Sequence, residues 1–285
     1  MSPSTSIPNQ ELFTPCFELA QSLEEKLSAH YENGEIYSLN KNKSAKVSAE
    51  TLEVIKKGVY YGKLSRGKFD ISILPLSRLW NFDKGEHEPP AVQELKEAAA
   101  KIDYTRIKIS GDAVHLEEYT ELDLGGIAKG YIADKLAQYL IDSGVENALL
   151  DLGGNIYALG SRQGEPFRIG IADPKNPQEV VGYLELTDCS AVTSGIYQRY
   201  LTWEGKRYHH ILDTGMPANN SLASATVISQ NSADCDALST ICMLLGEEQA
   251  LELINSIEGV SAVLVRRDGE IILSQSAQEI FRRSG

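Results

Sequence analysis

The segment DLGGIAKG, residues 123–130, places an aspartate, three glycines and a lysine directly before a helical pattern. Glycine turns let the backbone approach a ligand closely, and a helix N-terminus attracts anions. Lys129 could neutralise a phosphate, and Asp123 could accept hydrogen bonds from a base or a sugar. The glycine spacing of a P-loop and that of a dinucleotide-binding turn are both absent. The segment therefore predicts an anion site of another kind, with a plain strand-to-helix turn and a solvated lysine as the alternative.

A second candidate site is the segment DCDALSTICMLLG, residues 234–246, which has the pattern of a helix. Asp236 and Thr240 are four residues apart and Ser239 is three residues after the aspartate, so their oxygen atoms share one helix face. Carboxylate and hydroxyl oxygens are ligands for a hard cation such as Mg²⁺, which commonly keeps waters and substrate phosphates in its other positions. The alternative is that the acidic residues only stabilise the start of the helix through its dipole.

Two adjacent histidines, His209 and His210, precede an aspartate in the segment YHHILDTGMP. Neutral imidazole is available near pH 7, so either histidine could act as a general base. Neighbouring residues on a strand face opposite sides, and at most one of the two is expected to face a site. A histidine with a structural role is the alternative interpretation.

The helices that must position these residues are predicted from apolar periodicity and from capping residues. Ser48 and Ser232 can each cap a helix, and Gly144 and Gly246 can each end one. The apolar stripe of the first helix begins at Phe17. The predicted helices cover residues 12–27, 49–64, 132–140, 233–245 and 247–256.

The predicted strands outnumber the helices and come in runs. A β-branched strand begins the segment at residues 67–82 and is broken by Pro75, and hairpins are predicted across Gly111–Asp112 and Asp268–Gly269. This pattern favours the α+β class, with mixed or antiparallel sheets and packed helices. No solenoid repeat or low-complexity linker occurs, so residues 1–285 are treated as one domain. Further strands are predicted within residues 148–160, 167–174, 180–186, 191–213 and 224–229.

Composition and charge exclude several classes of function. The formal net charge of -13 would repel a polyanion, so nucleic-acid binding is not expected. No apolar run reaches the roughly 20 residues that span a bilayer, and the sequence begins without the pattern of a signal peptide. The expected location is cytoplasmic as the sequence stands, or extracytoplasmic and membrane-associated if an export or lipoprotein signal was removed. Four cysteines form neither a C-x-x-C pair nor a zinc spacing.

Taken together, these segments resemble the ApbE family of FAD:protein FMN transferases, from about Leu23 to the C-terminus. KLSAHYENGEIYSLN is similar to the family's early helix and turn, and SRGKFDISILPLSRLWNF resembles S.GaFDiTv.PL..LW.F. LDLGGIAKGYIADKL is close to the family's hallmark vDLGGiAKGyavD. The same order continues in LLDLGGNIYALG, IGIADP, AVTSGIYQRY and CDALSTICMLLG.

The resemblance implies a flavin transferase with the ApbE-like fold. Such an enzyme binds FAD, splits its pyrophosphate with Mg²⁺, and attaches FMN through a phosphoester to a threonine of an acceptor protein, releasing AMP. The acceptor would be a subunit of a flavin-dependent redox complex. Hydrolysis of FAD to FMN and AMP in the same pocket and non-catalytic flavin binding are the alternatives. The intact Asp236 and Thr240 pair favours an enzyme, and His210 favours transfer over hydrolysis.

The resemblance also implies roles for individual residues, carried over by position. His210 would activate the acceptor threonine, and Asp236 would be a catalytic metal ligand. The full set of implied metal ligands is the backbone carbonyl of Gly126 and the side chains of Asp236, Ser239 and Thr240. The implied FAD-binding residues are Lys68, Phe69, Asp70, Asp123, Lys129, Thr193, Ser194, Gly195 and Leu212.

Three features depart from the family pattern. The N-terminal MGT strand, which forms part of the flavin pocket, has no counterpart in MSPSTSIPNQEL. HILDTGMP is two residues shorter than the usual HIIDPxTGxP, and Ser239 stands where some members have a second aspartate. The segment NSLASAT, which ends at Thr226, looks like an acceptor sequence. It occupies the position of a core strand in the family, so self-modification is not expected.

Overall fold

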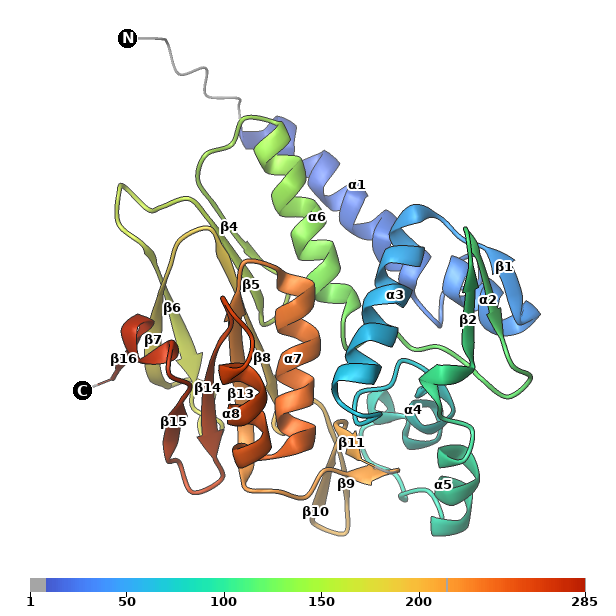
Figure 1. The fold of residues 1–285 in the computed structure, drawn as a ribbon. Coiled ribbons are helices and arrows are strands. Elements are labelled where there is room, and N and C mark those ends of the chain that lie inside the picture. The colour runs from blue at the N-terminus through green and yellow to red at the C-terminus, as the bar shows by residue number, and fades with distance from the viewer. Residues whose placement is uncertain (1–8, 214, 285) are drawn as a thin grey trace.

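A computed structural model of the chain describes residues 9–213 and 215–284. Its centre is a six-stranded sheet in which all the strand pairs are antiparallel. Figure 1 shows helices packed along one face of this sheet. The strands, in spatial order, are β15 (Ile271–Leu273), β14 (Ser261–Arg266), β13 (Leu222–Ser229), β8 (Cys189–Gly195), β5 (Asn155–Leu159) and β4 (Ala148–Asp151).

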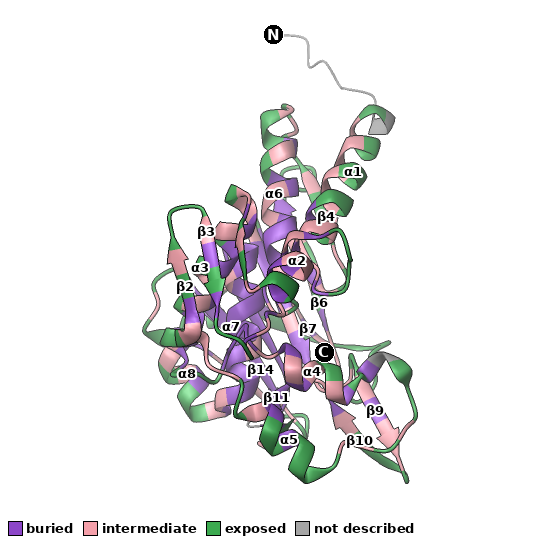
Figure 2. Cartoon of the chain, turned by 90° about the vertical axis from the view of Figure 1, so that its right-hand side faces the viewer, coloured by how far each residue is buried: buried purple, intermediate pink, exposed green. Residues whose placement is uncertain are grey.

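The central strand β13 is buried at every one of its 8 residues because both faces of the sheet are covered. On one face, Ala225 and Val227 belong to the large core that the helices complete with residues such as Leu238. The purple interior in Figure 2 follows this helix–sheet contact. The helices on this side are α1 (Asn9–Leu27), α6 (Ala128–Asp142), α7 (Ser232–Leu245) and α8 (Glu247–Asn255).

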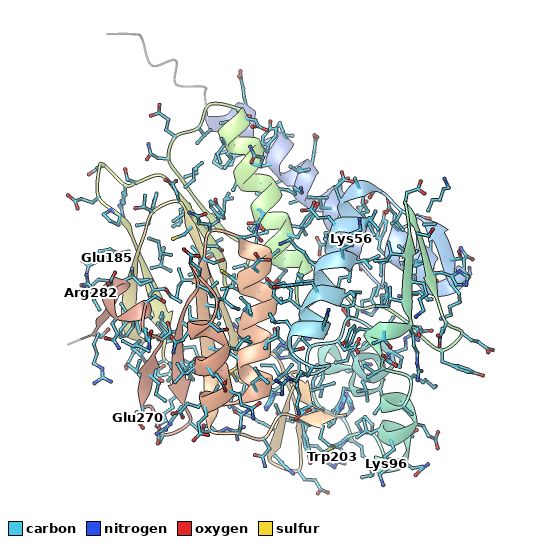
Figure 3. All side chains as sticks on the ribbon, viewed as in Figure 1. Lys56, Lys96, Glu185, Trp203, Glu270 and Arg282 are labelled. Atoms are coloured by element: carbon cyan, nitrogen blue, oxygen red, sulfur yellow. The ribbon has the colours of Figure 1, made fainter. Side chains whose placement is uncertain are left out.

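The other face is covered by a second, three-stranded antiparallel sheet. Ile171 and Phe281 from this sheet form a separate core with Ile228 of β13. Arg282 and Glu185 form a 3.2 Å ion pair between two of its strands, at the edge of the molecule labelled in Figure 3. In spatial order the strands are β16 (Phe281–Arg283), β7 (Val180–Leu186) and β6 (Phe167–Ala172), and the short helix α9 (Ala277–Ile280) leads into β16.

The remaining elements form a flank beside the helical layer, as Figure 1 shows. The upper part of this flank consists of α2 (Glu35–Asn42), β1 (Ser44–Lys46), α3 (Ala49–Leu64), β2 (Ile107–Ser110) and β3 (Ala113–Leu116). The lower part contains α4 (Leu74–Trp80), η1 (Phe82–Lys84), α5 (Val92–Ala99) and η2 (Tyr104–Arg106). Two small hairpins complete it: β9 (Tyr200–Trp203) with β10 (Lys206–His209), and β11 (Leu212–Asp213) with β12 (Met216–Pro217).

The expected α+β class with antiparallel sheets and packed helices is confirmed. The strand predicted near residue 70 is wrong: the chain there is a loop that enters α4, with Pro75 in the first helical turn, where its missing amide costs nothing. Phe17 is 72% exposed instead of core-facing. The side chain of Asn231, and not that of Ser232, caps α7 by accepting from the amide of Asp234.

Helices α2 and α5 were not predicted from the sequence. Each is only eight residues long, which is too short to show a clear apolar periodicity. Among the described residues, no helix combines the length and apolarity needed to cross a membrane. The prediction that the MGT strand is missing falls on residues 1–12. Residues 1–8 of that segment lie outside the described part of the chain.

Candidate active site

Helices α6 and α7 run in opposite directions and meet at Gly130. A Cβ atom on Gly130 would lie 2.3 Å from the carbonyl oxygen of Ser232, so only glycine permits this approach. Asp236 Oδ2 accepts a 2.9 Å hydrogen bond from the Gly130 amide, near the N-terminus of α6. Asp134 on α6 reciprocates by accepting from the amides of Ser232 and Ala233, at 2.6 and 2.9 Å, at the start of α7. Each helix therefore caps the other, and this exchange fixes Asp236 beside the glycine turn.

Hydroxyl groups gather next to Asp236. Ser194 Oγ, near the end of β8, lies 2.8 Å from Ser239 Oγ and 3.2 Å from Thr240 Oγ1. Ser239 Oγ also donates to the backbone carbonyl of Asp236 at 2.9 Å. A Cβ on Gly126 would lie 4.0 Å from Thr240 Oγ1 and 3.0 Å from Phe69 Cε2. The predicted metal residues are thus brought together, with Ser194 and the ring of Phe69 against them.

The Asp236 carboxylate lies in a buried environment with positive charge nearby. Asp236 is only 4% exposed. Burial raises the pKa of Asp236, whereas the ammonium of Lys129, the amide of Gly130 and the side chain of Asn155 lower it. Asn155, at the start of β5, is a neighbour that the sequence analysis did not identify. The sequence indicated this neighbour only through the asparagine amide in the turn of DLGGNIYALG.

His210 presents one ring nitrogen as an acceptor. Its Nδ1 lies 3.0 Å from the carbonyl oxygen of Arg199, which also accepts from the His210 amide at 3.1 Å. A carbonyl oxygen only accepts, so Nδ1 carries the proton in neutral imidazole and Nε2 keeps its lone pair. Burial, together with the charges of Arg199, His209 and Lys129, lowers the pKa of His210 to about 4, although the bond to the Arg199 carbonyl opposes this shift. His209 instead bonds the carbonyl of Ala218 through Nε2, at 3.0 Å.

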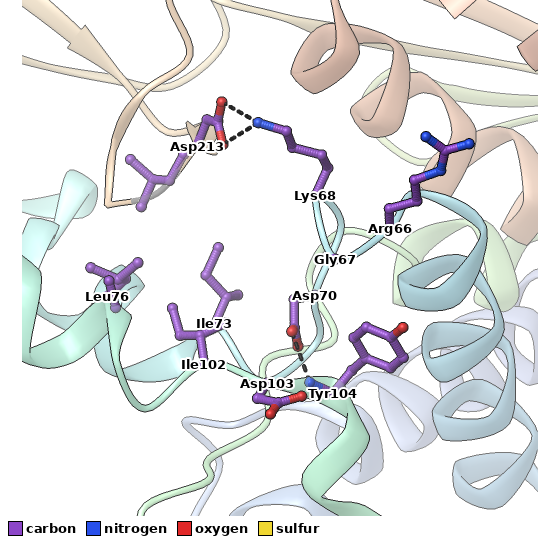
Figure 4. Close-up of a pocket in the computed structure, with 12 residues that line it drawn as sticks. Arg66, Gly67, Lys68, Asp70, Ile73, Leu76, Ile102, Asp103, Tyr104 and Asp213 are labelled. Carbon is purple, nitrogen blue, oxygen red and sulfur yellow. Dashed lines mark hydrogen bonds and ion pairs between the residues drawn. The ribbon is translucent and has the colours of Figure 1, made fainter. Parts of the chain in front are cut away.

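A cavity of about 370 Å³ lies between the loop after α3, helix α4, the loop after α5, and β11. Figure 4 shows Ile73, Leu76 and Ile102 on its apolar side and an ion pair across from them. The pair joins Lys68 Nζ to Asp213 Oδ2 at 2.7 Å. The remaining lining residues are Arg66, Gly67, Asp70, Ala99, Asp103, Tyr104 and Leu212.

Three of the predicted FAD-binding residues line this cavity: Lys68, Asp70 and Leu212. Asp70 is buried, and its carboxylate accepts from the Tyr104 amide at 2.8 Å and from the Ser72 amide and hydroxyl at 2.8 and 2.7 Å. These bonds hold the cavity floor together. Burial raises the pKa of Asp70 despite them.

Two further predicted residues have their side chains engaged by the protein itself. Asp123 accepts from Gly125 N and from Ser77 Oγ, both at 2.9 Å, which fixes the glycine turn against α4. Thr193 faces away from Ser194 because the strand alternates, and its Oγ1 lies 2.8 Å from that of Thr226. Thr226 is buried in β13, in agreement with the expectation that it is not an acceptor.

Two further cavity residues, Arg66 and Gly67, belong to the segment SRGKFDIS, which resembles the family pattern, but they were not predicted as site residues. Arg66 and Gly67 adopt left-handed backbone angles, with φ of 56° and 83°, which turn the chain sharply before Lys68. Gly195 ends β8, where a Cβ would lie 2.5 Å from the ring of Tyr197. Gly67 beside Lys68 was the one local sign of a turn at this wall.

Comparisons with known proteins found relatives that are similar in sequence and in overall structure. The FAD:protein FMN transferase of Treponema pallidum is 33% identical over 278 residues, covering 90% of this chain and 77% of that protein. A Klebsiella pneumoniae protein of the same name is 33% identical, covering 93% and 85%. The crystal structure of the ApbE protein of Thermotoga maritima superposes with a TM-score of 0.91 at 28% identity, over 99% of this chain and 94% of that one.

The flavin transferase ApbE of Vibrio cholerae is also similar in structure, with a TM-score of 0.86 and 28% identity over 98% of this chain and 93% of that one. The model of the ApbE family matches residues 5–264. Because the family model matches most of the chain and these relatives cover most of it, the chain belongs to the ApbE family.

Proposed function

We propose that this protein transfers FMN from FAD to a threonine hydroxyl of an acceptor protein, with Mg²⁺ bound at Asp236. The observation that carries the proposal is the meeting of Asp236, Ser239 and Thr240 with the glycine turn at Gly126. The similarity to named FAD:protein FMN transferases supports the same activity. The acceptor is expected to be a subunit of a redox complex, as the family resemblance implies.

The donor set at Asp236 fits a hard divalent cation. It offers one buried carboxylate, the hydroxyls of Thr240 and Ser239, and a glycine whose missing Cβ leaves room beside Thr240. Within residues 9–213 and 215–284, no three His, Cys, Asp or Glu side chains form a metal-binding group. A cation here would therefore depend on substrate phosphates for much of its coordination. When bound, Mg²⁺ would neutralise the charge that develops on the pyrophosphate.

The chain's own residues would position the two reactants. The positive charge of Lys129 lowers the pKa of both Asp236 and His210, so the ammonium is near enough to interact with both groups. That position suits an anionic pyrophosphate, and the neighbouring cavity, lined partly by Leu212, suits part of FAD. Phosphoryl transfer depends mainly on positioning and charge neutralisation, which these residues can supply.

His210 would accept the proton of the acceptor threonine at Nε2. The threonine oxygen forms a bond to the phosphorus of the FMN half, the pyrophosphate P–O bond breaks, and AMP leaves with that electron pair. Because burial lowers the pKa of His210, its ring is neutral near pH 7 and ready to accept a proton. Arg199 fixes the ring through the Nδ1 bond.

The test is incubation of the protein with FAD, Mg²⁺ and a threonine-containing acceptor domain, followed by intact-mass measurement of the acceptor. An FMN adduct that disappears when EDTA replaces Mg²⁺ is the expected result. AMP release without an adduct would identify a hydrolase instead. Bound FAD without any turnover would contradict both enzymatic functions.

A further inference from the structure

An ion pair joins two walls of the cavity, between residues 145 positions apart in the chain. Lys68 Nζ lies 2.8 and 2.7 Å from the two carboxylate oxygens of Asp213. Figure 4 shows the pair spanning the side of the cavity opposite Leu76. The side chains are 39% and 29% exposed, so the pair lies at the rim and not in the core.

The segment that Asp213 belongs to is held from two sides of the cavity. Strands β11 and β12 are two residues each, and the register pairs Leu212 with Pro217. Trp80 Nε1 donates to the carbonyl of Gly215 at 2.9 Å, on the α4 side of the segment. Lys68 binds it from the opposite wall. The ion pair therefore ties the segment that carries Leu212 to the loop after α3, across the rim of the cavity.

The direction of Lys68 is set by its own turn. Arg66 and Gly67 both have left-handed backbone angles, and the Lys68 amide bonds the carbonyl of Ser65 at 3.2 Å. The lysine stem is consequently directed across the rim toward Asp213, as Figure 4 shows. A lysine on a loop without this fixed turn would lose more backbone entropy on forming the pair.

We propose that the Lys68–Asp213 ion pair is a positioning device that holds the Leu212 wall against bound FAD and slows its release. This inference rests on the proposed function, because it takes FAD as the occupant of the cavity. A half-exposed ion pair has a modest effect, which corresponds to a change in release rate of about three- to fivefold. Salt should weaken it, since exposed charges are screened.

The experiment measures the rate of FAD release by flavin fluorescence, in EDTA so that FAD is not consumed. The variants Lys68→Met and Asp213→Asn remove one charge each while they keep the shape of the side chain. The double variant and the exchanged pair Lys68→Asp/Asp213→Lys complete the set. Lys46→Met is the matched control, because Lys46 of β1 forms an exposed 3.2 Å ion pair with Asp112, in the turn of the β2–β3 hairpin.

Each single variant is expected to release FAD about three- to fivefold faster, and the double variant no faster than either one. The exchanged pair should return the rate to within about twofold, and added salt should accelerate release from the unmodified protein more than from the variants. The control should match the unmodified protein.

Additive effects of the two single variants would overturn the inference. So would slower release from Asp213→Asn, because that result would mean that Lys68 bonds FAD directly and Asp213 competes for it. If the unmodified protein binds no FAD in EDTA or in Mg²⁺, the proposed function itself fails. If it binds FAD and the variants release it at the same rate, only the role of the ion pair fails.

Discussion

The carboxylate of Asp236 accepts a hydrogen bond from the backbone amide of Gly130, a residue 106 positions earlier in the chain. Asp134, one turn further along α6, accepts from two amides at the start of α7. The two aspartates tie the helices together at the point where the candidate metal residues gather. Asp236 lies on the same helix as Ser239, whose hydroxyl donates to the backbone carbonyl of Asp236, and Thr240, whose hydroxyl lies 3.2 Å from that of Ser194.

Replacing Asp236 by asparagine separates its structural role from its chemical role. An amide oxygen can still accept from Gly130, so the melting temperature should change by only a few degrees. The lost negative charge should lower Mg²⁺-dependent AMP release by about 100-fold or more. Rates of AMP release and thermal melting measure the two effects.

Asp234→Asn is the matched control for that variant. Asp234 lies on the same helix but pairs with Lys57 of α3 at 2.6 Å, away from the hydroxyl cluster. Its AMP release should stay within about threefold of the unmodified protein. Equal losses in the two variants would show that helix packing, and not a metal ligand, explains the effect at Asp236.

The pH dependence of transfer should reflect the low pKa of His210. Because that pKa is lowered to about 4, the ring stays neutral and able to accept a proton well below pH 6.5. The acidic limb of kcat/KM, which reports the free enzyme, is expected near pH 4 and should disappear in His210→Asn. A limb near pH 6.5 that persists in the variant would rule out His210 as the base.

The same group contributes to stability with a definite sign. The folded-state pKa of His210 lies below its ordinary value of 6.5, so the unfolded chain binds the proton more tightly. This contribution is fully present above about pH 6.5 and is lost as the pH falls toward 4. The free energy of unfolding of the unmodified protein should therefore fall more steeply from pH 7 to 5 than that of His210→Asn. Identical slopes in chemical denaturation would contradict the assignment.

Two glycines of the hallmark segment should respond differently to an added methyl group. Gly130→Ala forces a Cβ against the backbone of Ser232 and should cost about 1–3 kcal/mol of stability. The Cβ of Gly126→Ala would come closest to the ring edge of Phe69, at 3.0 Å, and the ring can shift. We expect Gly126→Ala to keep most of its stability but to lose activity. Urea unfolding and AMP release together test this contrast, and the reverse ranking of stabilities would refute it.

Local patterns predicted most elements because they depend on near neighbours. The periodicity of α3 and α7 and the hairpin β2–β3 were confirmed at residues close to those expected. The strand near Pro75 was wrong because β-branched residues there pack in a loop that enters a helix. The treatment of residues 1–285 as one domain stays a prediction.

The residues of the candidate site could be predicted from the sequence, but the hydrogen bonds between them could not. Asp236 and Thr240 share a helix face, as their spacing indicated, whereas the bond from Asp236 to Gly130 depends on tertiary packing. The predicted contact of Asp123 with FAD stays a prediction, and its oxygens accept hydrogen bonds from Ser77 and Gly125. Thr193 faces the opposite side of the sheet from Ser194. Side-chain alternation along β8 could have predicted this from the sequence.

The most direct test of the central claim counts AMP molecules against FMN adducts on the acceptor protein. With FAD and Mg²⁺, the account predicts one AMP released for each adduct, and no adduct on an acceptor whose threonine is replaced by valine. AMP release that continues at the same rate without any acceptor, and with no adduct when the acceptor is present, would contradict flavin transfer.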